Sequence, residues 1–478
     1  MECKYDMADI VINDLGSFLE YLGKKQRRRI IKQEVSRDLE ITEFSDRACR
    51  EHPNKAPAMV FEDVSGFDSH VATNILASSE TLSELFGTER ITGLLATLSS
   101  NGENLRIFDA ARALISAKPK TMGFNGKKYT RIGGFDELPI LKVWPNDAGR
   151  YITQPIVVTC DPEDGSLNAG IYRMQVFDNE SAGMHWQAQK GGAMHFGKLK
   201  EGDMKVTVAL GTDPYNLLSA ITPLPEGVNE FSAAGILRGN RSLLVGNGKY
   251  PPAPANAETL LFGSVSKGDN AIEGPFGDHT GYYSIPQEYP VFRLEAAYSK
   301  KNAIYPASVV GFPWNEDATI GLFLTELLKP VLKSMNKCIT DIYLPPEGLF
   351  TSTCFVSINK RVPGEAKKAM FSLLGFGQLS FIKIMAVFDD DIDIRDSKKV
   401  LWALSSRVEP ERDIQIIRGT PLDSLDHSSG TVNFGSKVLI DATKKGKEEG
   451  YYRDWPDVIS MSEDIKRRVD KKWNSATY

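Results

Sequence analysis

Two short stretches of the sequence combine charged side chains with residues typical of turns. In the first, DPEDGSLNAGIYRMQVFD, Asn168, Tyr172 and Arg173 lie among glycines between two runs typical of β-strands. The planar guanidinium group of Arg173 can bind a carboxylate or a phosphate through two parallel hydrogen bonds. Spacing alone leaves an alternative equally open, in which Arg173 pairs with a nearby acid and links strands of a barrel.

The second stretch, AIEGPFGDHTGYY, carries Glu273 and Asp278 on either side of a Gly-Pro-Phe-Gly turn that can direct both carboxyl groups toward one cavity. There, one acid can stay ionised beside an arginine while the other, in a drier environment, has a raised pKa and donates a proton. Equally open is an acid that caps the backbone of its own turn. His279 fits packing or hydrogen bonding better than catalysis.

Other chemistries lack their sequence motifs. The six histidines show no HxH or HExxH spacing, which argues against a zinc hydrolase but leaves an oxygen-rich magnesium or manganese site open. There is no GxGxxG or GxxxxGKS/T nucleotide-binding motif and no GxSxG nucleophile elbow. We therefore expect neither a Rossmann or P-loop nucleotide site nor a serine hydrolase.

Composition and charge indicate a globular enzyme-sized protein. The five cysteines are scattered without a CxxC pair, which fits a reducing cytoplasm, and the net charge of −5 gives no reason to bind nucleic acid or an anionic membrane. The basic cluster at residues 24–29 is interpreted as a solvated face. The N-terminus lacks a signal-peptide pattern and no apolar run reaches about 18 residues, so we expect a cytoplasmic protein without a membrane span.

The elements that must position these side chains fall into three regions. Residues 1–125 mix amphipathic helical patterns with short strands, which predicts an N-terminal α/β domain. Within it, Leu15, Phe18, Leu19 and Leu22 recur at helical spacing and should form one buried face.

The two later regions differ from each other in their residue patterns. Residues 126–315 consist of short β-type runs separated by glycine and proline, which predicts a central barrel or sandwich. Residues 316–478 return to helical periodicity with strand-like runs, and Pro330 should kink or break their first helix. The chain closes on an amphipathic helix in which Val469 and Trp473 are four apart. The prediction is a multidomain α/β protein with a central β domain.

In this order, the stretches resemble the UbiD family of reversible decarboxylases, and the resemblance runs almost end to end. DLGSFLEYL and PAMVFEDVSGF resemble the family's opening pattern, NAGIYRMQ its cofactor- and carboxylate-binding segment, and LPEGVNEFSAAGILRG its metal-acid segment. EGPFGDHTGYY resembles its catalytic loop, and DDDIDIRDSKKVLWAL is similar to its C-terminal segment near the cofactor phosphate. Each motif alone is moderately specific, and their common order is highly specific.

The resemblance implies a fold and a catalytic triad. The fold is a split β-barrel like that of flavin reductases, between an N-terminal α/β layer and a C-terminal α/β domain that mediates homodimers or homohexamers. Arg173 would hold the substrate carboxylate, Glu273 would pair with Arg173, and Asp278 would deliver the proton that replaces CO₂. Desolvation and the charge of Glu273 should favour the protonated form of Asp278.

The resemblance also implies a cofactor site for prenylated FMN and a divalent metal, Mn or Mg, with potassium as a further candidate. Asn168 and Glu230 match two metal ligands, and Lys398 matches a lysine that reaches the cofactor phosphate. Residues that would line the flavin through backbone or packing contacts are Ile171, Tyr172, Thr222 and Pro223.

One position departs from the family pattern. Where much of the family has a histidine metal ligand, the segment AQKGGA places Gln189, with Lys190 beside it. A glutamine oxygen can still ligate Mg²⁺ or Mn²⁺, which favour oxygen donors. Alternatively, Lys190 could pair with the phosphate directly and partly replace the cation.

The function implied is reversible decarboxylation of an aromatic or α,β-unsaturated acid through a covalent adduct with prenylated FMN, which a flavin prenyltransferase would supply. Loss of CO₂ from an sp² carbon leaves a carbanion that needs a cofactor as electron sink. The alternative is a UbiD-like non-catalytic or assembly subunit of a multisubunit carboxylase, which the missing histidine would fit. Retention of Arg173, Glu273 and Asp278 favours the enzyme, and a plain flavin reductase would not need the Glu273 and Asp278 loop.

Overall fold

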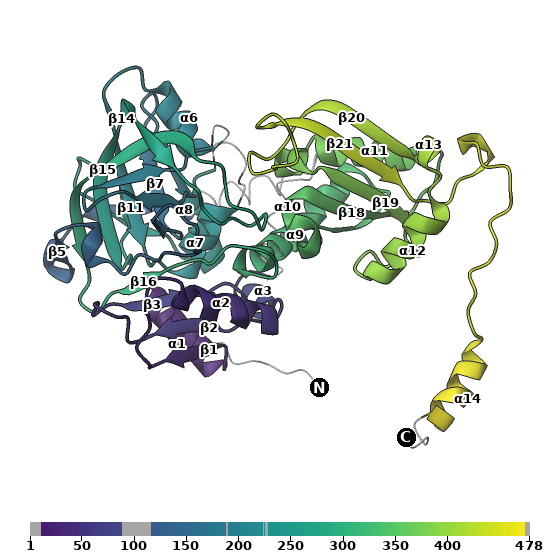
Figure 1. The fold of residues 1–478 in the computed structure, drawn as a ribbon, viewed down its shortest axis with the longest axis horizontal. Coiled ribbons are helices and arrows are strands. Elements are labelled where there is room, and N and C mark those ends of the chain that lie inside the picture. Colours follow the sequence, from purple (N-terminus) through teal and green to yellow (C-terminus); the bar gives the residue numbers. More distant parts are fainter. Residues whose placement is uncertain (1–10, 88–115, 188–189, 223, 225–227, 474–478) are drawn as a thin grey trace.

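A computed structural model describes residues 11–87, 116–187, 190–222, 224 and 228–473 of the chain. The strands of these residues form four sheets, and the chain passes through an N-terminal, a central and a C-terminal part (Figure 1). Within this portion of the chain, no helix is long and apolar enough to cross a membrane.

The N-terminal part is a four-stranded sheet with helices. Its elements are α1 (Leu15–Lys24), β1 (Arg28–Ile31), α2 (Glu40–Glu51), β2 (Ala58–Phe61), β3 (His70–Thr73) and α3 (Ser79–Phe86), completed by β16 (Ile304–Pro306). The Asp14 side chain caps α1. Leu15, Phe18, Leu19 and Leu22 are buried, which confirms the face that their spacing predicts. Because β16 pairs with β3, the chain returns to this first sheet after the central part.

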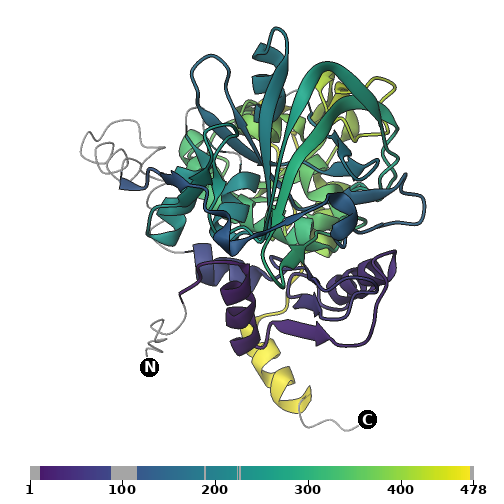
Figure 2. The ribbon, with the colours of Figure 1, turned by 90° about the vertical axis from the view of Figure 1, so that its left-hand side faces the viewer.

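The central part is a nine-stranded sheet that curls into a half-barrel (Figure 2). Its strands are β5 (Thr130–Ile132), β6 (Arg150–Ile152), β7 (Ile156–Cys160), β8 (Leu167–Ile171), β9 (Met174–Val176), β10 (Ser181–Met184), β11 (Asp203–Leu210), β14 (Thr259–Glu273) and β15 (Gln287–Ser299). The longest two, β14 and β15, pair antiparallel, with register shifts in the β14 segment. Side chains such as Val157, Met174, Val206 and Phe292 fill the interior and are fully buried.

Three helices and a small sheet surround the half-barrel. The helices are α6 (Gly191–Lys198), α7 (Pro214–Ile221) and α8 (Glu230–Arg238), and the small sheet consists of β4 (Lys120–Gly123), β12 (Leu243–Gly246) and β13 (Ala253–Pro254). The Asn229 side chain caps α8 by accepting from the N–H groups of its first turn, so that helix begins at Glu230.

The C-terminal part is a five-stranded sheet with the order β17-β18-β19-β21-β20. Its strands are β17 (Ile339–Tyr343), β18 (Thr353–Ile358), β19 (Ile384–Asp389), β20 (Ile414–Pro421) and β21 (Phe434–Asp441), and its helices are α9 (Glu316–Met335), α10 (Leu349–Ser352), α11 (Glu365–Leu374), α12 (Ser397–Arg407) and α13 (Pro410–Asp413). Met385 and Val387 of β19 pack with α11, whereas Ala386 and Phe388 pack with α12. Successive side chains of β19 point to opposite faces of the sheet, and a helix packs on each face.

Helix α9 connects the N-terminal and C-terminal cores (Figure 1). Phe323 near its start belongs to the core of the N-terminal sheet, and Leu332 near its end belongs to the core of the C-terminal sheet. The helix continues past Pro330, so of the kink or break expected there, the break does not occur. Burial on both sides offsets the roughly 3 kcal/mol that an internal proline costs a helix.

The last helix, α14 (Glu463–Trp473), stands apart from the rest of the chain (Figure 1). The helix forms as its periodicity predicts. It has no buried residue, and Val469 and Trp473 are 47% and 70% exposed.

Candidate active site

Arg173, Glu273 and Asp278 come together within the half-barrel. Arg173 lies between β8 and β9, Glu273 is the last residue of β14, and Asp278 lies in the turn before β15. The Nε atom of Arg173 donates to Glu273 Oε1 at 3.0 Å and its Nη2 atom donates to Oε2 at 3.2 Å. Its Nη1 atom donates to Asp278 Oδ2. One guanidinium group therefore contacts both carboxylates.

The turn that carries Asp278 is fixed by side chains of neighbouring strands. Gln175 of β9 accepts a hydrogen bond from the Gly274 amide at 2.8 Å. Gly274 has a φ of +101°, which favours glycine. Ser284 accepts from the Phe276 amide at 3.1 Å and from Arg173 Nη2 at 3.3 Å. The Gly-Pro-Phe-Gly turn is thus shaped so that its acid faces the arginine.

His185 is a further member of the site, and nothing in the sequence pointed to it. Its Nδ1 atom lies 2.9 Å from Glu273 Oε2. Burial lowers the pKa of His185, so it faces Glu273 as a neutral imidazole whose Nδ1–H donates. The pKa of Glu273 is lowered although burial opposes this, because His185 and Arg173 stabilise the carboxylate. Glu273 is therefore ionised.

Asp278 is also held as a carboxylate, which corrects the expectation that its surroundings favour the protonated form. Burial raises the pKa of Asp278, but the hydrogen bond and charge of His279 and the charge of Arg173 outweigh burial and bring it below the usual range. His279 Nδ1 lies 2.8 Å from Asp278 Oδ1, so His279 does make the hydrogen bond that was expected of it. Two cationic neighbours, rather than the charge of Glu273, decide the state of this acid.

A second cluster forms where β8, α6 and α8 meet. The Asn168 amide donates to the Tyr172 hydroxyl at 3.3 Å, and the Gly192 amide donates to the same oxygen at 3.2 Å. Glu230 accepts from the Ala169 amide at 3.2 Å. Burial raises the pKa of Glu230 to about 7. The structure thus brings together Asn168, Tyr172 and Glu230, as the sequence predicts.

The residues of this cluster fit a divalent cation next to an anionic group. Glu230 is a buried acid, and an adjacent cation would offset the cost of its charge. Trp186 Nε1 is buried and has no hydrogen-bond partner among the residues that the structure describes. Burial lowers the pKa of Lys190, the residue before α6, which indicates an ammonium group that gains from a nearby anion. Among the described ranges, no group of three or more His, Cys, Asp or Glu side chains could hold a metal ion, so amide and carboxylate oxygens would be the ligands.

The other predicted cofactor residues have different outcomes. Ile171 ends β8, and Thr222 follows α7 and donates to the Leu218 carbonyl at 2.8 Å. Gln189 and Pro223 lie outside the residues that the structure describes. Lys398 lies exposed in the first turn of α12, and the structure does not bring it to Asn168 or Glu230.

A loop of the C-terminal part covers the Arg173 site. A cavity of about 70 Å³ is lined on one side by Arg173, His185, Ser284, Ile285, Gln287 and Tyr289, and on the other by Ser424, Leu425, Asp426, His427, Ser429 and Val432. Gln187 donates to Ser424 Oγ at 3.0 Å, and the rings of Tyr282 and His427 lie 6.0 Å apart. Residues 423–432, between β20 and β21, therefore form the covering loop. No motif identified it, because its residues approach the site only in three dimensions.

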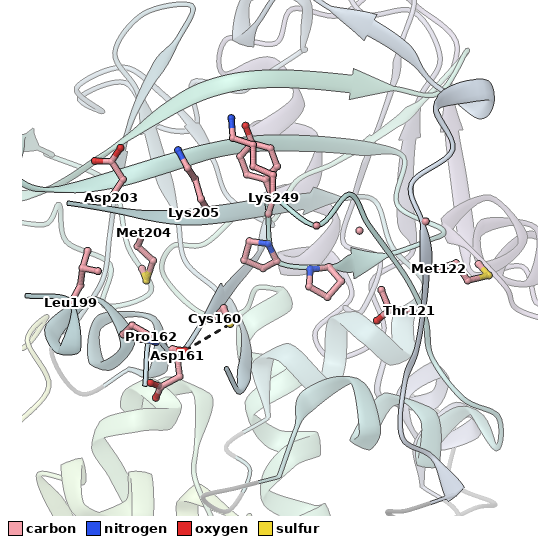
Figure 3. Close-up of a pocket in the computed structure, with 16 residues that line it drawn as sticks. Thr121, Met122, Cys160, Asp161, Pro162, Leu199, Asp203, Met204, Lys205 and Lys249 are labelled. Atoms are coloured by element: carbon pink, nitrogen blue, oxygen red, sulfur yellow. Dashed lines mark hydrogen bonds between the residues drawn. The ribbon is translucent and has the colours of Figure 1, made fainter. Parts of the chain in front are cut away.

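A larger cavity, of about 650 Å³, lies elsewhere on the half-barrel (Figure 3). It is formed by β4, β12, the start of β11 and the turn after β7. Its two lysines, Lys205 and Lys249, both pair with Glu295 at 2.6 Å, so they share one carboxylate. None of the predicted site residues lines this cavity.

Three family models match consecutive segments of the chain. They describe the N-terminal domain (residues 19–98), the Rift-related domain (125–313) and the C-terminal domain (318–442) of 3-octaprenyl-4-hydroxybenzoate carboxy-lyase. The fold is that of the UbiD-class decarboxylases. The chain belongs to the UbiD family.

Individual relatives agree with this assignment. An uncharacterized protein of Archaeoglobus fulgidus is 43% identical over 96% of this chain and 98% of its own length. The UbiD-class enzyme HmfF of Pelotomaculum thermopropionicum, solved with FMN, is 25% identical with a TM-score of 0.79, covering 96% of this chain and 99% of that one. Vanillic acid decarboxylase of Sedimentibacter hydroxybenzoicus in its closed form is 25% identical with a TM-score of 0.82, covering 97% and 99%.

Proposed function

We propose that this protein is a prenylated-FMN-dependent carboxy-lyase that removes or adds CO₂ on an aromatic or α,β-unsaturated acid. The observation that carries the proposal is the buried contact of Arg173 with both Glu273 and Asp278 beside a cavity. Membership of the UbiD family supports the reaction class. The FMN complex of HmfF supports a flavin, and the name of vanillic acid decarboxylase supports an aromatic substrate.

Each of the three residues has a role that its contacts permit. Arg173 would bind the substrate carboxylate through the part of its guanidinium group that now contacts Asp278, because its Nε and Nη2 atoms already form a two-point contact with Glu273. Glu273 would stay ionised and keep Arg173 oriented, with His185 holding its second oxygen. Asp278 would place a proton on the carbon that loses CO₂. A substrate carboxylate bound to Arg173 would weaken the attraction between Arg173 and Asp278. The pKa of Asp278 would therefore rise.

The cofactor would be held by the second cluster. Asn168 and Glu230 would bind Mn²⁺ or Mg²⁺ through oxygen atoms, and Lys190 would face the cofactor phosphate. When bound, prenylated FMN supplies the electron sink that the departing CO₂ requires. We further propose that residues 126–315 are the cofactor-binding domain with a flavin-reductase-like barrel, flanked by domains 1–125 and 316–478, the last of which forms the homo-oligomer contact.

The test uses the full chain co-expressed with a flavin prenyltransferase. Absorption and mass spectrometry of the purified protein should reveal bound prenylated FMN. Oxygen-free incubation in D₂O with a panel of aromatic and unsaturated acids and their decarboxylated products should then show deuterium at one carbon of one compound. Protein expressed without the prenyltransferase is the control.

Two outcomes would contradict the proposal. Bound cofactor without exchange on any compound would rule out this substrate class. Complete absence of flavin would instead favour the alternative of an assembly subunit in a multisubunit carboxylase, and the next experiment would be to isolate its partner chain.

A further inference from the structure

His279 occupies a position that the roles of Arg173, Glu273 and Asp278 leave unexplained. Its Nδ1 atom lies 2.8 Å from Asp278 Oδ1, and its backbone amide donates to the same oxygen, also at 2.8 Å. Arg173 contacts the other oxygen of that carboxylate. Asp278 is therefore held between two side chains, His279 on Oδ1 and Arg173 on Oδ2.

The charge of the His279 ring is influenced by acids from other parts of the chain. Its second ring nitrogen, Nε2, is buried and has no hydrogen-bond partner within the described residues. Three carboxylates favour the charged ring: Asp278 of the same turn, Asp423 of the covering loop, and Asp317 in the first turn of α9. Phe350 of α10 packs near the ring at 5.8 Å and adds no charge.

The electrostatic consequence is an imidazolium. Burial lowers the pKa of His279, but the hydrogen bond to Asp278 and the charges of Asp278, Asp423 and Asp317 outweigh burial and raise it to about 9. Burial raises the pKa of Asp317 to about 6, although the charge of His279 opposes this. At neutral pH the histidine therefore carries the proton and Asp317 is largely ionised.

Two cationic side chains, Arg173 and His279, contact Asp278, and only one of them can release a proton. The pKa of Arg173 is raised because its two acids outweigh burial, and a guanidinium does not deprotonate in proteins. An imidazolium does, close to physiological pH.

We propose that His279 is a positioning residue that holds Asp278 and supplies the proton that Asp278 delivers. This inference rests on the proposed function, in which Asp278 protonates the substrate carbon. The Nδ1–H proton moves to Oδ1 of Asp278, leaving a neutral imidazole and a carboxylic acid. The acid then gives its proton to the carbon and returns to carboxylate, and water reprotonates the imidazole. One proton enters from solvent for each one delivered.

Through Asp423, the charge of His279 also depends on the covering loop. Its carboxylate comes from the C-terminal part and favours the charged forms of both His279 and Lys190. The imidazolium is thus most stable when this loop covers the cavity, so the proton is best held when the site is closed.

The first experiment is an NMR titration of the six histidine imidazoles in the full chain without cofactor. His279→Gln identifies the signal by its loss. We expect a midpoint near the pKa of about 9 that the surrounding acids impose. Asp317→Asn and Asp423→Asn should each lower the midpoint by about 1 pH unit. Asp393→Asn, an exposed acid of the C-terminal part, should leave it unchanged.

Two results of the titration would overturn the inference. A midpoint at or below 6.5, the ordinary value of histidine, would mean that no imidazolium exists at neutral pH. An unchanged midpoint in both Asp317→Asn and Asp423→Asn would show that these two acids do not raise the pKa of His279.

The second experiment uses whichever acid exchanges deuterium in the panel. His279→Gln can still donate a hydrogen bond to Asp278 but carries no transferable proton, so kcat should fall about 100-fold with KM unchanged. The alkaline limb of the kcat pH profile should disappear. A wild-type profile in His279→Gln would exclude the proton supply. If no acid exchanges at all, the proposed function fails and the proton supply fails with it, whereas the titration still decides whether His279 is charged.

Discussion

The guanidinium of Arg173 and the carboxylate of Glu273 form a two-point contact, at 3.0 and 3.2 Å, across 100 residues of sequence. The same guanidinium also contacts Asp278, so two buried acids depend on one cation for charge balance. Removal of one partner from a buried ion pair leaves an uncompensated charge and is strongly destabilising.

Arg173→Ala should therefore affect both stability and activity. We expect the free energy of unfolding to fall by about 3–5 kcal/mol, measured by urea denaturation, together with complete loss of turnover. Arg173→Lys keeps the charge but not the fork geometry, so it should recover much of the stability and little of the activity. Equal stability of Arg173→Ala and wild type would show that the two acids are balanced in another way.

Asp278→Asn should separate proton delivery from folding. The variant keeps the shape of the side chain, and Arg173 keeps its contact with Glu273, so the fold and the retained flavin should stay intact. Loss of the buried charge between Arg173 and His279 should lower the melting temperature without unfolding the protein. Deuterium exchange into the substrate carbon should fall at least about 100-fold. Asp278→Glu, which retains an acid, should keep a measurable fraction of the rate. Wild-type exchange in Asp278→Asn would refute the role assigned to this acid.

Lys190→Ala should weaken retention of the cofactor, because the buried ammonium is expected to face its phosphate. Gln189→Ala should act in the same direction through the metal. The ratio of flavin to protein after gel filtration measures both effects. Lys198→Ala, at the other end of the same helix and paired with Asp161, is the matched control. Normal retention in Lys190→Ala and Gln189→Ala would contradict this account of the cofactor site.

Glu316 should give the protein a stability that depends on pH. This fully buried acid of α9 accepts from the Leu76 amide at 2.7 Å and from Ser308 Oγ at 3.0 Å, and burial raises its pKa to about 7. The folded state therefore binds a proton more tightly than the unfolded state. The resulting stability is present below the ordinary pKa of about 4.5 and is lost as pH rises through about 7.

The measurement is urea denaturation of the protein between pH 5 and 8. Glu316→Gln should flatten the decline of unfolding free energy over this range, because the amide mimics the protonated acid without titrating. Glu20→Gln, an exposed acid of α1, should leave the slope as it is. Identical slopes in Glu316→Gln and wild type would show that another group controls this range.

Leu425→Ala should change which acids the enzyme accepts. Leu425 belongs to the covering loop, lines the cavity of about 70 Å³ and is 8% exposed. Truncation enlarges the cavity, so kcat/KM should rise for bulkier acids relative to the preferred one. Leu401→Ala, an exposed leucine of α12, is the control. Unchanged selectivity would place the selecting contacts elsewhere.

Local patterns in the sequence identified several of the elements and the residues proposed to bear the chemistry. The spacing of Leu15, Phe18, Leu19 and Leu22 predicts α1, because helical periodicity depends only on neighbours in sequence. The change of residue pattern along the chain also predicts a β part between two α/β parts. Residue types, together with the family resemblance, indicated the three residues of the triad.

Only the tertiary structure decided the charges around these residues. The pairing of β14 with β15 and the curl of the sheet bring His185 to Glu273 across 88 residues. The packing of α9 and the covering loop brings Asp317 and Asp423 close to His279. The expected state of Asp278 was wrong for this reason, since a pKa depends on every charge within several ångströms, wherever it lies in the chain. Sequence determined which groups are present, and long-range packing determined which of them hold protons.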